Sequence, residues 1–175
     1  MQKIFWGLLF LFIDISLGSL SITPSWVGYL LIRSGMGDVS ESAVFQRTRT
    51  LAAWAAAFSG VIWLQPLLNI SIQFPSVFFS LIMTGIGLSL QLLITYRIVE
   101  GVRELETVYG RDMQSSRLLT GWKIMLAGIL IAFGLMIFLS ELAAAGLILT
   151  AVAAVYYVVK FYRAMRIYKE VVTHP

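Results

Sequence analysis

The sequence predicts an all-α fold, a polytopic bundle of transmembrane helices with six segments. Apolar residues make up 59% of the chain and charged residues only 13%, and the mean hydropathy is +0.86. Soluble domains carry about a quarter charged residues. With 175 residues, the length is that of a single domain, so we expect one integral membrane domain over residues 1–175.

Six apolar stretches follow one another along the chain. A helix needs roughly 20 mostly apolar residues to cross the hydrocarbon core. Five stretches approach that length and one is shorter, in the order 4–21, 25–36, 50–70, 76–98, 118–139 and 142–159. The short segment opens with Thr23 as N-cap and Pro24 at the first helical position, and Gly35 and Gly37 end it. It either spans the membrane or re-enters it.

The basic residues gather on one side of this arrangement. If the N-terminus lies inside, 12 of the 13 Lys and Arg residues fall in cytoplasmic loops or tails, and Arg33 is the exception. The opposite loops, residues 19–25, 71–75 and 140–141, contain none. The positive-inside rule therefore predicts a multi-pass plasma (inner) membrane protein with both termini in the cytoplasm.

Two parts of the chain resemble each other. Arg49 and Trp54 correspond to Arg117 and Trp122 at an offset of 68 residues, and the pairs Tyr-Arg at 96–97 and 162–163 match at an offset of 66. We predict three helical hairpins, residues 1–40, 45–110 and 115–171, of which the second and third form a parallel repeat. The alternative is that membrane interfaces collect Arg, Trp and Tyr in any case.

Small residues recur every four positions on two segments. This spacing lets helix backbones approach closely in lipid and predicts helix contacts within the monomer. The residues are Ala52, Ala56 and Gly60, and then Gly146, Thr150 and Ala154.

Asp14 is the first candidate for a functional site. On a continuous first helix it would lie about 16 Å from Lys3, near the midplane, where an unpaired carboxylate is costly. In an antiparallel hairpin Arg33 would reach a similar depth, and Ser16 would extend the polar strip. The pair is either a working intramembrane site or a salt bridge that only fixes the hairpin.

Other polar residues give weaker predictions. Gln65, Asn69 and Gln91 could line a cavity, although hydrogen bonding between helices is the commoner use of such groups. The fourth segment is expected to continue as a helix toward Tyr109, and the last one beyond residue 159. That last extension carries a basic stripe that would attract anionic lipid headgroups or an acidic partner, namely Lys160, Arg163, Arg166 and Lys169.

The composition also excludes several classes of function. The chain has no cysteine, and its one histidine is His174, so no metal site and no catalytic residues are predicted. We expect no cofactor and no enzymatic activity. A soluble basic domain is lacking, which excludes nucleic acid as a partner.

Residues 14–18 read Asp-Ile-Ser-Leu-Gly, and residues 22–32 read Ile-Thr-Pro-Ser-Trp-Val-Gly-Tyr-Leu-Leu-Ile. This segment resembles one in small uncharacterised polytopic membrane proteins of Gram-positive bacteria. In that pattern an aspartate usually stands where this chain has Ser25. The resemblance covers about a tenth of the chain and implies a bacterial plasma membrane, without an activity.

The sequence favours one function and leaves a second as the alternative. The first is a small transporter or channel-like protein that uses Asp14 and Arg33. The second is a non-catalytic accessory, assembly or immunity-type membrane protein that acts through its cytoplasmic basic extensions. Its partners would be the lipid bilayer with its anionic lipids, and a membrane protein or a second copy of the chain.

Overall fold

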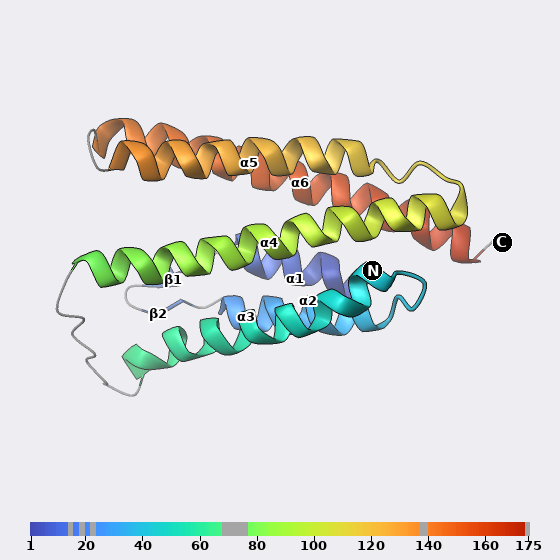
Figure 1. Ribbon diagram of the computed structural model, residues 1–175, viewed down its shortest axis with the longest axis horizontal. Coiled ribbons are helices and arrows are strands. Elements are labelled where there is room, and N and C mark those ends of the chain that lie inside the picture. The colour runs from blue at the N-terminus through green and yellow to red at the C-terminus, as the bar shows by residue number, and fades with distance from the viewer. Residues whose placement is uncertain (14–15, 18–19, 22–23, 68–76, 137–139, 174–175) are drawn as a thin grey trace. The chain divides into compact units, whose positions relative to one another are not determined.

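Six helices and one pair of very short strands make up the described part of the chain, as the computed structural model shows (Figure 1). The structure describes residues 1–13, 16–17, 20–21, 24–67, 77–136 and 140–173. The elements are α1 (Gln2–Phe12), β1 (Ser16–Leu17), β2 (Leu20–Ser21), α2 (Ser25–Gly37), α3 (Ala43–Leu67), α4 (Val77–Tyr109), α5 (Ser115–Met136) and α6 (Ser140–Thr173).

The first helix is shorter than the sequence predicts. We expected one segment over residues 4–21, but α1 ends at Phe12 and Ile13 is already extended, with φ −98° and ψ 91°. The strands β1 and β2 then pair antiparallel, with Leu17 opposite Leu20. The two residues between them in the sequence, Gly18-Ser19, are of the kind that favours a two-residue β-hairpin. Apolar composition alone does not distinguish such a hairpin from a helix.

The next two helices have identifiable starts. Pro24, which was predicted at the first helical position, is instead the N-cap of α2, so the helix starts one residue later than predicted, and it ends within one residue of the predicted boundary. Helix α3 begins seven residues earlier than predicted. There the Ser42 hydroxyl accepts a hydrogen bond from the Phe45 N–H at 3.2 Å, which supplies the partner that a helix start needs.

The predicted continuation of the fourth and sixth helices beyond their apolar segments is confirmed. Helix α4 continues to Tyr109, where Gly110 follows with φ +63°, and α6 is continuous to Thr173. Glycine commonly follows a helix end in this left-handed conformation because it has no Cβ. At 1.5 Å per residue, each helix is about 50 Å long, or about 20 Å longer than the hydrocarbon core.

The chain divides into two compact units, Met1–Arg97 and Ile98–Pro175. In the first unit, α1 packs antiparallel on α2, and α2 also packs on α3. Glycines let α1 and α2 approach: a Cβ on Gly7 would lie 2.6 Å from the Gly28 carbonyl oxygen, and one on Gly35 would lie 2.6 Å from the Ile4 nitrogen. The small-residue face of α3 is buried at Ala52 and Ala56, as predicted.

In the second unit, α5 packs along α6. A Cβ on Gly128 would lie 2.9 Å from the Thr150 nitrogen, one on Gly146 would lie 2.6 Å from the Ala132 nitrogen, and Gly121 faces Tyr157. Because later residues of α5 contact earlier residues of α6, the two helices are antiparallel. The contact predicted from Gly146 and Thr150 is therefore confirmed as one within the monomer.

Three of the described helical segments are long and apolar enough to cross a membrane, namely Leu81–Tyr109, Ser115–Gly134 and Ala144–Thr173. Helix α1 is apolar but has 11 residues, which corresponds to about 16 Å and is too short to cross by itself. Six crossings, the three-hairpin arrangement and the repeat between residues 45–110 and 115–171 stay predictions.

Candidate functional site

The described part of the first helix does not reach the expected polar strip around Asp14. Helix α1 ends before Asp14, which lies outside the described residues, and Ser16 belongs to β1. Arg33 lies on α2 with its side chain exposed. The premise that Asp14 and Ser16 continue the first helix is therefore wrong, while the pairing of Asp14 with Arg33 stays a prediction.

The structure describes only some of the other cavity candidates. Asn69 lies outside the described residues, and Gln65 is placed by its backbone alone, in α3. Gln91 lies in α4 and is half-buried, and its carbonyl accepts a hydrogen bond from the Thr95 hydroxyl at 2.8 Å. The three residues stay candidates for a cavity.

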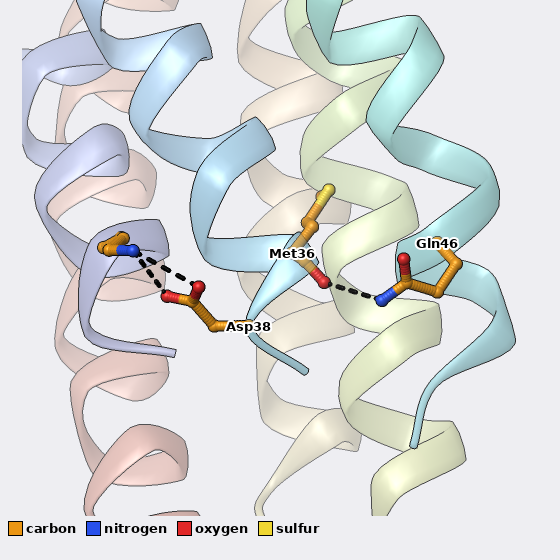
Figure 2. A network of polar contacts seen from close by, with 4 residues as sticks. Met36, Asp38 and Gln46 are labelled. Atoms are coloured by element: carbon orange, nitrogen blue, oxygen red, sulfur yellow. Dashed lines mark hydrogen bonds and ion pairs between the residues drawn. The ribbon is translucent and has the colours of Figure 1, made fainter. Parts of the chain in front are cut away.

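A polar network joins three helices at the C-terminal end of α2 (Figure 2). The Lys3 ammonium on α1 lies 2.9 Å from the Asp38 carboxylate, and both side chains are half exposed. On the other side, the Gln46 amide of α3 donates to the Met36 and Val39 carbonyls, at 3.1 and 2.9 Å. The Met36 carbonyl also accepts from the Val39 N–H at 3.4 Å, so the Gln46 amide adds a second partner there and supplies one to Val39, just beyond the end of α2.

Asp38 and Gln46 were missed in the sequence because their partners are distant. Lys3 and Asp38 are separated by 35 positions, and Gln46 bonds to backbone atoms seven and ten positions away. The only local signal is Gly37 at the end of a helical pattern, which indicates a helix end that needs partners for its carbonyls. Arg49 extends the network by donating to the Gln46 side-chain oxygen at 3.2 Å.

A second polar cluster holds the start of α5. The Glu106 carboxylate on α4 accepts hydrogen bonds from the backbone N–H groups of Met113 and Ser115, each at 2.8 Å, and from the Ser115 hydroxyl. A carboxylate at this position satisfies free N–H groups and interacts favourably with the helix dipole. Glu106 thereby fixes the turn between α4 and α5.

The predicted basic stripe on α6 has two different parts. Lys160 is 8% exposed, and its ammonium lies 5.2 Å from the centre of the Tyr156 ring, within range of a cation–π interaction. Arg163, Arg166 and Lys169 are exposed. A spacing of three residues turns each successive side chain by about 60° around the helix, so the four do not lie on one face.

The end of α4 is joined to this part of α6. The rings of Tyr109 and Tyr168 meet edge to face with their centres 5.9 Å apart. The basic end of α6 is therefore in contact with the end of α4 within the second unit. Its exposed cations are presented from a packed helix, which limits the conformational freedom that binding would remove.

Among the residues that the structure describes, no three His, Cys, Asp or Glu side chains lie close enough to hold a metal ion. Comparison with protein-family models, with curated proteins and with solved structures finds no match. The function must therefore be argued from the chain itself.

Proposed function

We propose that this chain is an integral membrane protein of accessory or assembly type, which has no turnover of its own and binds an acidic partner with the basic end of α6. The partner would be a membrane protein with an acidic surface. The membrane would be a bacterial plasma membrane, with both termini on its cytoplasmic side.

The observation that carries this proposal is the outer face of α6, where exposed apolar side chains give way to exposed cations. Ile148, Val152 and Val155 are each more than 60% exposed. Such apolar exposure along a whole helix is unfavourable in water and typical of contact with lipid. Further along the same helix, Arg163, Arg166 and Lys169 are exposed in the part that exceeds the membrane thickness.

The transport alternative has less support. It depends on a charged pair buried within the bundle, and the first helix that was to bring Asp14 to the midplane ends at Phe12. Arg33, the other member of the pair, is exposed. Ion flux through the purified protein in liposomes, abolished by Asp14→Asn, would restore this alternative.

Co-purification tests the proposed function. The full chain, solubilised from its membrane, should retain a stoichiometric acidic membrane-protein partner. The double variant Arg166→Gln/Lys169→Gln should lose it, because two of the cations that bind the partner are gone. Arg47→Gln, an exposed arginine on α3, is the matched control and should keep the partner. An equal yield of partner in all three proteins would contradict the proposal.

A further inference from the structure

The packing of α5 against α6 brings two basic residues to the same level. Gly121 lies against Tyr156 and Tyr157. One helical turn further toward the same end of the two helices, α5 carries Arg117 and α6 carries Lys160. The contact of Gly128 with Thr150 follows the same antiparallel register. The register therefore sets Arg117 opposite Lys160, and Arg163 follows Lys160 by three residues.

These three side chains form a cationic cluster without an acidic partner. Arg117 and Arg163 both interact electrostatically with Lys160, and both are exposed. No carboxylate among the residues described forms an ion pair with any of the three. Glu106 on α4 already accepts hydrogen bonds from Met113 and Ser115 at the start of α5.

Such a cluster is unfavourable unless an anion joins it. Three like charges repel one another, and Lys160 has lost more than nine tenths of its contact with water. A phosphate group suits this arrangement because a guanidinium can donate two parallel hydrogen bonds to its oxygens and an ammonium can add a third. The cluster has the chemistry of a phosphate site.

The surroundings favour a lipid as the source of the phosphate. Val155 and Val159, on the turns of α6 next to Lys160, are 65% and 46% exposed. They continue the apolar outer face of α6 away from the cluster. A molecule with its phosphate among the three cations could therefore lay its acyl chains along this face.

We propose that Arg117, Lys160 and Arg163 bind the phosphate of an anionic lipid headgroup at the level where α6 leaves the hydrocarbon core. This site goes beyond the partner-binding function and requires only that α5 and α6 lie in a membrane. Of the exposed cations at the basic end of α6 it uses Arg163 alone, since Arg166 and Lys169 take no part in it.

Lipid titration of the purified full chain tests the site. In neutral detergent, the thermal unfolding temperature should rise with added phosphatidylglycerol and not with phosphatidylcholine. Arg117→Gln and Arg163→Gln should each weaken the apparent affinity about fivefold, which corresponds to the roughly 1 kcal/mol that one cation near the surface contributes. Lys160→Met should weaken it at least as much, and Lys160→Arg should retain most of it.

Three comparisons make the outcome decisive. Lys123→Gln removes an exposed cation from the same helix as Arg117 and should leave the lipid titration unchanged. If this variant loses as much affinity for phosphatidylglycerol as Arg117→Gln, the attraction is diffuse and the proposed site is wrong. Inorganic phosphate could also saturate the shift in unfolding temperature at the same concentrations as phosphatidylglycerol. That result would show that the phosphate need not come from a lipid and would overturn this part of the proposal. If Lys160→Met does not fold, the test rests on Arg117→Gln and Arg163→Gln. Unchanged affinity for phosphatidylglycerol in both variants would overturn the proposal.

The variant Arg166→Gln/Lys169→Gln separates this inference from the proposed function. It should lose the protein partner and keep the response to phosphatidylglycerol. Loss of the lipid response in Arg117→Gln with the partner retained would support the lipid site alone.

Discussion

The α1–α2 pair and the α5–α6 pair are built on the same contact but differ in length. In both, glycines bring two antiparallel backbones together, through Gly7 and Gly28 in the first pair and Gly128 and Gly146 in the second. The first pair has helices of 11 and 13 residues, the second of 22 and 34. Close packing is thus independent of helix length, and the long pair alone has the length to cross a membrane and extend beyond it.

The two pairs also differ in the polar groups that hold their ends. An ion pair between half-exposed side chains, Lys3 and Asp38, joins α1 to the end of α2. At the start of α5, one carboxylate, that of Glu106, accepts three hydrogen bonds from Met113 and Ser115. Hydrogen bonds to a charged group are worth more than an exposed ion pair. We therefore expect the Glu106 hydrogen bonds at the start of α5 to contribute more to stability than the Lys3–Asp38 ion pair at the end of α2.

The largest expected effect is that of Gly128→Ala. The new Cβ would lie 2.9 Å from the Thr150 nitrogen and 3.0 Å from the Gly146 oxygen, so two backbones must separate. We expect a loss of about 1–3 kcal/mol in the free energy of unfolding, measured by denaturation in mixed micelles. The matched control is Gly134→Ala on the same helix, where no atom lies within 4 Å. It should be neutral or stabilising by up to about 1 kcal/mol.

Gly7→Ala is expected to act locally rather than on the whole chain. Its Cβ would lie 2.6 Å from the Gly28 oxygen and 2.9 Å from the Ile32 nitrogen, but α1 is short and can separate from α2 by itself. Amide hydrogen exchange in α1 should accelerate about tenfold, while exchange in α5 should not change. Gly85→Ala, at a site with no atom within 4 Å, is the control. Equal acceleration in α1 and α5 would show that the two regions do not open independently.

Glu106→Gln should destabilise the turn between α4 and α5. The amide oxygen can take the place of Oε1 and still accept from the Met113 and Ser115 N–H groups, but the NH₂ group cannot accept the hydrogen bond of the Ser115 hydroxyl, and the negative charge at the start of α5 is lost. The expected loss is about 1–2 kcal/mol in the free energy of unfolding. Glu170→Gln, an exposed residue of α6, makes the same chemical change and should have no effect. No difference between the two variants would refute the role of Glu106.

The smallest expected effect is that of Asp38→Asn. Both partners of the Lys3–Asp38 ion pair are half exposed, so the change should cost less than about 1 kcal/mol. The cost should shrink further as salt is added. Glu41→Gln, an exposed carboxylate in the same loop, is the control. A loss above 2 kcal/mol would mean that this ion pair, and not the glycine contact, holds α1 in place.

Local signals in the sequence were sufficient for several elements. Pro24 predicted the start of α2 to within one residue, and the charged continuations predicted that α4 extends to Tyr109 and α6 through Lys169. The end of α1 was missed because apolarity was given more weight than Gly18-Ser19, whose hairpin preference is also local.

The clusters could not be predicted because they depend on contacts between distant residues. Lys3 meets Asp38 only once α1 and α2 are packed. Arg117 lies opposite Lys160 only in the register that the glycine contacts impose on α5 and α6. Periodicity on a single helix assigned Lys160 to an exposed stripe, whereas packing against its neighbours buries it.

Site-directed labelling tests the central claim most directly, namely that α6 crosses the membrane and keeps its basic end in the cytoplasm. The sequence contains no cysteine, so Ser140→Cys and Val172→Cys each introduce a single thiol, near the start and the end of α6. In intact cells, a membrane-impermeant maleimide should label Ser140→Cys and should reach Val172→Cys only after permeabilisation. Labelling of both variants from the same side of the membrane would contradict the account.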